Sequence, residues 1–131
     1  MADPDDIRRL LEGYAEAWKV GDLEVLLGAY ADDVVFHYFG GTDLAGAHVG
    51  KEAAVQAMVT VSTRAARELL EVVDVLAGDR LGTLVVRERL VRDGEQADVQ
   101  RVFLYRVDGK RIVECWVLDE DQALIDRFWR S

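Results

Sequence analysis

Apolar residues recur at helical spacing in four parts of the chain. The first predicted helix covers residues 5–20, and Pro4 suits its first turn. Its apolar face is made by residues at intervals of three and four, namely Ile7, Leu11, Tyr14 and Trp18. The same spacing predicts a short helix over residues 23–30, a third over residues 51–66 and a last one over residues 120–129.

Runs rich in β-branched and aromatic residues predict strands between these helices. The first strand is VVFHYF over residues 34–39, and a loop with four glycines follows it over residues 40–50. Four more strands follow in a row, divided by the turn sequences GDR, RDGEQ and VDGK, at residues 68–78, 81–91, 97–107 and 111–119. Because helices and strands are segregated along the chain, we expect an α+β fold with helices packed on one face of a curved antiparallel sheet.

Length and charge narrow the classes of function. The 131 residues make one domain and include 25 acidic against 16 basic residues, a net charge of −9. This charge repels phosphate backbones and anionic membranes, so we expect neither nucleic acid nor membrane as a partner. No apolar run approaches the length of about 18 residues that a membrane span needs. The acidic start MADPDD lacks the features of a signal peptide, so we expect a cytoplasmic protein.

Residues able to bind a metal are few. Cys115 is the single cysteine, which rules out an internal disulfide bond. It shows no ligand spacing with His37 or His48. We therefore expect no metal and no other cofactor.

Three stretches of the chain resemble a known family. They are YAEAWKVGDLEVLLGAYADDVVFHYFGGTDLAGAHVGKEAAVQAM, RVDGKRIVECW and LDEDQALIDRFW. Their order and spacing are similar to those of the SnoaL-like branch of the nuclear transport factor 2-like superfamily. That superfamily includes ketosteroid isomerases, polyketide cyclases, epoxide hydrolases, dehydratases and non-catalytic binding modules. The resemblance implies a cone-shaped sheet wrapped around the long N-terminal helix, with an apolar cavity open at one end.

Relatives in this superfamily commonly form dimers through the outer face of the sheet. Here both faces of the predicted strand carry apolar residues, Val102 and Leu104 on one side and Phe103 and Tyr105 on the other. A half-exposed sheet would leave one face polar. We therefore expect a homodimer through the outer sheet face.

The resemblance also implies which side chains line the cavity, namely Tyr14, Trp18, Phe36, Tyr38, Met58, Phe103, Cys115 and Val117. Tyr14 falls where isomerase-like relatives place a tyrosine that donates a hydrogen bond to the oxyanion. Tyr38 stands where they keep the general-base aspartate, and Phe103 where they keep a second oxyanion donor. A phenol with a pKa of about 10 is a poor base at neutral pH, so ordinary ketosteroid isomerase chemistry is not expected.

His37 is the best general base in the chain by its chemistry. It has the opposite strand parity to Phe36 and Tyr38, so we favour a hydrogen-bonded structural histidine on the outer side of the sheet or at a seam where a helix packs. Cys115 and Val117 stand where cyclase-like relatives carry a His-x-Asp acid–base pair. Cys115 is expected to fill space as a small apolar residue.

Arg101 is predicted to lie on the same sheet face as Phe103, with a surface position as the alternative. A buried guanidinium needs a carboxylate partner or an anionic ligand, and Glu88 and Asp119 are the candidate partners. Asp119 has a second candidate role, because its spacing from Gln122 is that of a capping box at the start of the last helix.

These residues predict a protein that binds a small apolar or cyclic organic molecule in its cavity. If it is an enzyme, we expect proton transfer of the isomerase or cyclase type on a carbonyl compound. Tyr14 or Arg101 would hold the oxyanion beside Tyr38, and Asp119 or His37 would move the proton. The alternatives are a non-catalytic ligand-binding or interaction module, and an epoxide or lactone hydrolase, in which relatives use an arginine and two carboxylates to position a water.

Overall fold

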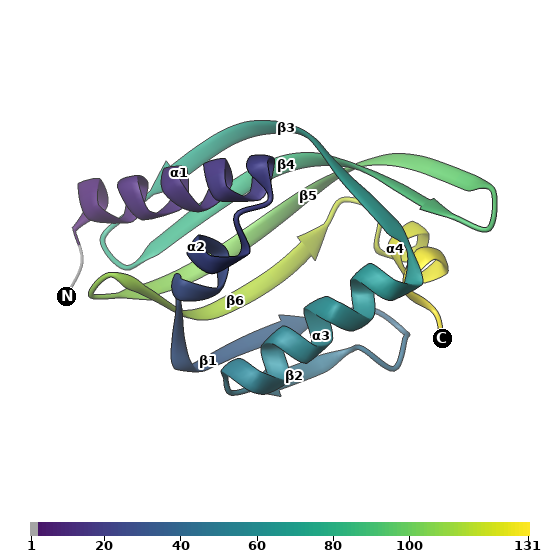
Figure 1. Ribbon diagram of the computed structural model, residues 1–131, viewed down its shortest axis with the longest axis horizontal. Helices are drawn as coiled ribbons and strands as arrows, with labels where there is room; N and C mark the ends of the chain where they lie inside the picture. The colour runs from purple at the N-terminus through teal and green to yellow at the C-terminus, as the bar shows by residue number, and fades with distance from the viewer. Residues whose placement is uncertain (1–2) are drawn as a thin grey trace.

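The structure of the protein is a computed structural model that describes residues 3–131 (Figure 1). The helices of this part of the chain are α1 (Pro4–Val20), α2 (Leu23–Gly28), α3 (Lys51–Arg64) and α4 (Gln122–Trp129). The strands are β1 (Tyr30–Tyr38), β2 (Gly46–Val49), β3 (Ala66–Ala77), β4 (Leu81–Arg92), β5 (Glu95–Asp108) and β6 (Arg111–Asp119). Within the same residues, no helix is both long and apolar enough to cross a membrane.

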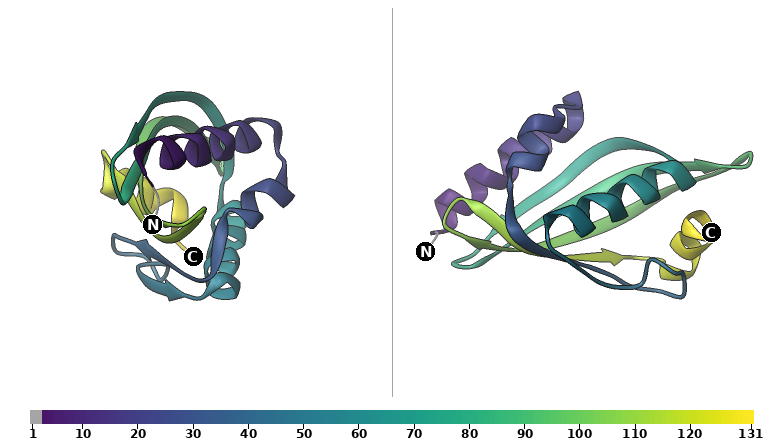
Figure 2. Two further views of the ribbon diagram at one scale, coloured as in Figure 1. Left: turned by 90° about the vertical axis from the view of Figure 1, so that its left-hand side faces the viewer. Right: turned by 60° about the horizontal axis from the view of Figure 1, so that its bottom comes forward.

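The strands form one six-stranded sheet in the order β2-β1-β6-β5-β4-β3, which confirms the predicted α+β fold. Neighbouring strands are antiparallel except for β1 and β6, which run parallel. The sheet is strongly curved, with α1 packed against β3 and β4 and α3 packed against β1 and β2 (Figure 2). The two helices and the concave face of the sheet therefore enclose the interior.

The first two strands of the chain differ from the sequence prediction. β1 begins at Tyr30 rather than at residue 34, because Tyr30 already pairs with Ile112 before the register shifts toward Val35. The exposed Asp32 and Asp33 between them interrupt the apolar pattern and concealed this start. The predicted glycine loop contains the short edge strand β2, whose mostly exposed residues pair with the end of β1.

The turn between β4 and β5 fixes which side chains of β4 face inward. Asp93 and Gly94 both have positive φ, +51° and +80°, as a two-residue type I′ turn requires. This turn pairs Arg92 with Glu95 and sets the register of the two strands. As a result Glu88 lies on the buried face of β4, a position that the sequence left undecided.

Gly82 allows α1 to lie directly on β4. A Cβ atom at this position would lie 2.5 Å from Leu11 Cδ1 and 2.6 Å from Ile7 Cγ2, closer than real Cβ contacts come. Ile7 and Leu11 are both fully buried, which confirms the predicted apolar face of the first helix. The close packing places the C-terminal half of α1, with Tyr14, over the concave face of the sheet.

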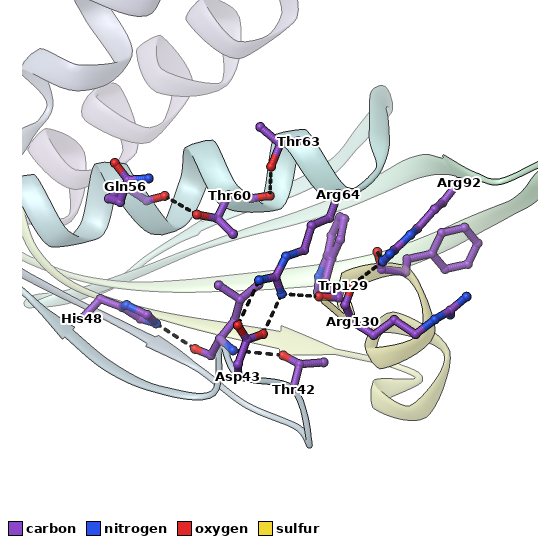
Figure 3. A network of polar contacts seen from close by, with 12 residues as sticks. Thr42, Asp43, His48, Gln56, Thr60, Thr63, Arg64, Arg92, Trp129 and Arg130 are labelled. Atoms are coloured by element: carbon purple, nitrogen blue, oxygen red, sulfur yellow. Dashed lines mark hydrogen bonds and ion pairs between the residues drawn. The ribbon is translucent and has the colours of Figure 1, made fainter.

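Helix α4 is held at the opposite end of the sheet by arginines (Figure 3). Arg64 Nη1 donates to the Trp129 carbonyl at 2.6 Å, and the same guanidinium bonds both carboxylate oxygens of Asp43. Arg92 Nη1 donates to the Phe128 carbonyl at 2.9 Å. These bonds satisfy carbonyls at the end of the helix that have no partner within it.

The start of α4 corrects one prediction. The side chain that caps the helix is that of Asp121, which accepts a hydrogen bond from Leu124 N at 3.1 Å. Asp119, which has capping-box spacing in the sequence, instead ends β6 and turns toward Arg101 on the neighbouring strand. A buried cation is a stronger partner for a carboxylate than an exposed helix end.

Candidate functional site

A cavity of about 400 Å³ lies between the concave face of the sheet and helices α1, α2 and α3. This volume lies at the lower end of the range of sites that bind small organic molecules. Its aromatic lining residues are Tyr14, Trp18, Tyr30, Phe36, Tyr38, Phe103 and Tyr105. Met58 of α3 and apolar residues of α2 complete the apolar part of the wall. Six side chains singled out in the sequence thus lie in the wall: Tyr14, Trp18, Phe36, Tyr38, Met58 and Phe103.

Cys115 and Val117 were expected in the wall and lie in the core behind it instead. Cys115 pairs with Phe36 on one side and Tyr105 on the other, and both neighbouring rings line the cavity. Because the short side chain of Cys115 is flanked by longer ones, the rings form the surface. Burial raises the pKa of the Cys115 thiol well above its ordinary value, so it stays neutral.

Four tyrosines line the cavity, namely Tyr14, Tyr30, Tyr38 and Tyr105. The hydroxyls of Tyr14 and Tyr30 are hydrogen-bonded to each other, and the Tyr30 hydroxyl lies 3.9 Å from Met58 Sδ. Burial raises the pKa of Tyr14 to about 12, although its bond with Tyr30 acts in the opposite direction. Burial raises the pKa of Tyr30, Tyr38 and Tyr105 as well. All of them are therefore protonated at neutral pH and can donate hydrogen bonds.

A network of charged side chains forms the polar end of the cavity. Arg101 Nε donates to Asp119 Oδ1 at 2.6 Å, and Arg101 Nη1 donates to Glu88 Oε1 at 3.1 Å. Arg67 donates to the same Glu88 through Nε at 3.1 Å and Nη2 at 3.2 Å. The side chains of Arg101, Glu88 and Asp119 are only 2%, 0% and 3% exposed. Arg101 therefore occupies the inward position, with both predicted carboxylates as partners.

Charge pairing keeps Glu88 and Arg101 ionised despite their burial. Burial alone would raise the pKa of Glu88, but the charges of Arg67 and Arg101 outweigh it and lower the pKa. Burial alone would lower the pKa of Arg101, but Asp119 and Glu88 raise it. The Trp129 ring covers the network, with its centroid 5.5 Å from the Arg101 guanidinium and 6.0 Å from that of Arg67.

The network turns its cations toward the cavity and its carboxylates away from it. Arg67 and Arg101 are among the lining residues, whereas Glu88 and Asp119 are not. In the part of the chain that the structure describes, no Asp, Glu or His lines the cavity. The wall therefore offers guanidinium and hydroxyl donors but no carboxylate or imidazole that could act as a general base.

Arg67, Tyr30 and Tyr105 are lining residues that the sequence prediction did not select. Tyr105 shares strand parity with Phe103, so the alternation of β5 carried a signal for it. Tyr30 was assigned to the second helix, although it is the first residue of β1. Arg67 is the second residue of β3, whereas the sequence prediction left it between a helix that ended at residue 66 and a strand that began at residue 68.

His37 lies on the outer face of the sheet, as its parity predicts, and not in the cavity. Its Nε2 is 2.5 Å from Glu114 Oε2, and its ring stacks on Trp116 with centroids 5.3 Å apart. The hydrogen bond with His37 lowers the pKa of Glu114, and Arg106 acts in the same direction. From this position His37 cannot move a proton in the cavity, which removes it from the catalytic candidates. His48, a residue of β2, has its Nε2 2.7 Å from the Leu44 carbonyl oxygen.

Solved structures with low sequence identity share this fold. A protein of unknown function with a cystatin-like fold from Xanthomonas campestris matches with a TM-score of 0.88 at 20% identity, covering 99% of this chain and 100% of that one. A candidate polyketide cyclase from Xanthomonas campestris pv. campestris matches with a TM-score of 0.75 at 18% identity, covering 97% and 99%. The structure of TerC co-crystallised with polyporic acid matches with a TM-score of 0.81 at 13% identity, covering 96% and 99%.

At these identities the structural likeness shows the fold alone. No curated protein matches the sequence of this chain. The sequence profile of a family described as the SnoaL-like domain matches residues 11–115, which include the C-terminal part of α1, the residues that line the cavity and most of the sheet. Because this match covers most of the 131 residues, the chain belongs to the SnoaL-like domain family.

Proposed function

We propose that the protein binds a small cyclic organic molecule with a carbonyl or related oxygen in its cavity. The observation that carries this proposal is the wall itself, in which aromatic rings surround a cluster of hydroxyl and guanidinium donors. Apolar pockets with a few converging polar groups are the usual form of a small-molecule site. The shared fold of a candidate polyketide cyclase and of TerC, co-crystallised with polyporic acid, supports a ligand of this kind.

The polar groups of the wall suit the oxygen of such a ligand. The bonded hydroxyls of Tyr14 and Tyr30 leave a proton on one of them for an acceptor in the cavity. Donors in a dry site stabilise negative charge that develops on a carbonyl oxygen, which is the contribution of Tyr14 and Arg101 to a cyclase-like or isomerase-like role. Asp119 is bonded to Arg101 outside the lining, and the described wall contains no carboxylate or histidine that could act as a general base. Binding with carbonyl polarisation is therefore the function that the geometry supports best.

One observation favours the alternative of an epoxide or lactone hydrolase. Arg101 lies between two carboxylates, Glu88 and Asp119, and an arginine between carboxylates is the arrangement that positions a water in relatives of that type. A hydrolytic water would have to touch a carboxylate oxygen and the ligand together. Both carboxylates are buried behind the arginine, so this geometry supports ligand binding over hydrolysis.

Fluorescence titration with the neutral dye N-phenyl-1-naphthylamine tests the binding proposal. We expect saturable binding of one dye per chain, with the blue shift of an apolar site. The ketone 1-tetralone should displace the dye at lower concentration than tetralin, because only the ketone accepts a hydrogen bond from the wall. Absence of saturable binding would contradict the proposed function, and equal displacement by both compounds would contradict its carbonyl part.

We also propose that the protein forms a homodimer through the outer face of its sheet. Two cross-strand pairs of apolar residues lie side by side there, Val102 with Leu118 and Leu104 with Trp116. Leu118 is 40% exposed, and the other three are only partly buried. A contiguous apolar patch on an open sheet face is typical of an interface, and a second copy offers the same complementary surface about a twofold axis.

Sedimentation equilibrium at micromolar concentration tests the dimer. The wild-type protein should sediment as a dimer, and Leu104→Asp should sediment as a monomer, because the variant would bury two unpaired carboxylates in the interface. Val20→Asp is the matched control, since Val20 is 68% exposed at the end of α1, away from the sheet face. A monomeric wild-type protein at these concentrations would refute the dimer.

A further inference from the structure

Arg67 combines three features that no other charged residue of the described wall shares. It lies at the junction of α3 and β3, lines the cavity and remains 22% exposed. Its guanidinium lies 5.8 Å from the centroid of the Trp18 ring, so it stands beside the aromatic part of the wall. It is thus a cation that both ligand and solvent can reach, whereas Arg101 is almost completely buried.

The hydrogen bonds of the two arginines also leave Arg67 more available to a ligand than Arg101. Arg101 uses Nε, Nη1 and Nη2 on Asp119 and Glu88, so each of its nitrogen atoms already has a carboxylate partner. Arg67 uses Nε and Nη2 on Glu88, and within residues 3–131 its Nη1 makes no hydrogen bond. A guanidinium carries two N–H groups on each terminal nitrogen. Arg67 therefore has donors left for a ligand.

The rest of the wall also favours a ligand that accepts hydrogen bonds. The phenols that line the cavity are protonated, and the described wall includes no side-chain carboxylate and no histidine. A ligand that brought its own N–H or O–H donors would find few acceptors, and burying unpaired donors is unfavourable. A ligand that brings acceptor oxygens would find donors throughout the polar end.

The charges nearest the cavity are positive. Glu88 and Asp119 balance the two arginines in number, but they lie behind them, so the network presents its cationic side to the ligand. The net charge of −9 acts against an approaching anion from a distance. Salt screens that repulsion beyond about 8 Å at physiological ionic strength, whereas a contact inside a buried site is screened much less.

We propose that, given the ligand binding proposed above, the cavity prefers cyclic molecules with an anionic oxygen group, such as a carboxylate, an enolate or a sulfonate, and that Arg67 is the residue that binds this group. Trp18 and Phe103, which pack edge to face with centroids 5.5 Å apart, would contact the ring of the same ligand. Arg67 then determines specificity by charge, while the aromatic wall supplies affinity for any ring of suitable size.

Two dyes with one skeleton separate these contributions. 8-Anilinonaphthalene-1-sulfonate carries a sulfonate on the ring system of neutral N-phenyl-1-naphthylamine. Arg67→Gln should weaken binding of the sulfonate dye by about tenfold or more, the size of a lost charge-assisted hydrogen bond, and leave binding of the neutral dye within about twofold. Arg67→Lys should restore part of the loss because it keeps the charge. Arg89→Gln is the matched control, since Arg89 makes the same two-point contact with a carboxylate, Asp98, outside the cavity.

Ser62→Asp gives a second test that does not disturb the buried network. Ser62 is an exposed residue of α3 that lines the cavity. A carboxylate there should weaken binding of the sulfonate dye and leave binding of the neutral dye unchanged. Equal effects on both dyes, or no effect on the sulfonate dye, would overturn the anion preference while leaving the binding function intact. Failure of the wild-type protein to bind either dye would overturn the binding function itself, and the anion preference with it.

Discussion

Arg101→Met is expected to lower the free energy of unfolding by about 3 to 5 kcal/mol, the cost of removing one partner from a buried ion pair. Methionine can occupy the space of the arginine stem, so the loss arises from charge rather than from an empty volume. Glu88 would keep Arg67 as a partner, but Asp119, bonded to Arg101 through Nε and Nη2, would remain buried without a cation. Urea denaturation followed by circular dichroism at pH 7 measures the effect.

Arg89→Met is the control for this variant. Arg89 binds both oxygens of Asp98 at 2.8 and 3.1 Å, but both side chains are substantially exposed, so water replaces the lost contact. We expect little change in stability. If Arg89→Met lowered the free energy of unfolding as much as Arg101→Met does, burial would not explain how the network stabilises the fold.

The difference in the free energy of unfolding between the wild-type protein and Arg101→Met should become smaller at acidic pH. The pKa of Glu88 in the folded wild-type protein lies below its ordinary value, so this residue stabilises the fold above its unfolded-state pKa and stops doing so as pH falls through the folded-state pKa. In Arg101→Met one of the two cations that lower this pKa is absent, and the folded variant takes up protons at higher pH. The variant therefore loses less stability between pH 7 and pH 4 than the wild-type protein does. A constant difference over this range would indicate lost packing instead of lost charge.

The position of Arg101 could be predicted from the sequence, whereas its full network could not. Alternation along β5 places Arg101 with Phe103, and the cost of a buried cation requires a carboxylate nearby. Whether a carboxylate of β4 reaches Arg101 depends on the register of β4 and β5 across their turn. That register follows from the positive φ angles of Asp93 and Gly94 rather than from hydropathy. Side-chain parity therefore predicts one strand well and its neighbour only when the turn is known.

Arg67 was missed because it lies between two predicted elements. The helical pattern of α3 continues to residue 66 in the sequence, but the helix ends at Arg64 and β3 begins at Ala66. Because of that shift of two residues, Arg67 belongs to a strand, and only then can its side chain be assigned to one face of the sheet. Arg64 is the last helical residue, and its side chain is held by Asp43 and the Trp129 carbonyl. The backbone is already extended at Ala65, with φ −148° and ψ 143°. The family resemblance predicted the cavity, but Arg67 and Arg101, which give it charge, lie outside the three stretches that carry the resemblance.

Met58→Trp is expected to weaken binding of both dyes by about a hundredfold or more, because the indole would occupy the space in which the naphthalene ring is buried. Met58 projects from α3 into the cavity, with its Sδ 3.9 Å from the Tyr30 hydroxyl. Filling an apolar cavity adds contacts that the wild-type wall lacks, so the free energy of unfolding should rise by about 0.5 to 2 kcal/mol. Titration of each dye and urea denaturation measure the two effects.

Met58→Leu is the control, because it preserves volume and should bind both dyes as the wild-type protein does. The comparison also locates the dyes. The apolar patch made by Val102, Leu104, Trp116 and Leu118 on the outer face could hold a naphthalene ring too, but it lies across the sheet from Met58. Binding to that patch would be unchanged in Met58→Trp and lost in Leu104→Asp. Loss in Met58→Trp with retention in Leu104→Asp would place the ligand inside the cavity, where Arg67 and the tyrosine hydroxyls can act on it.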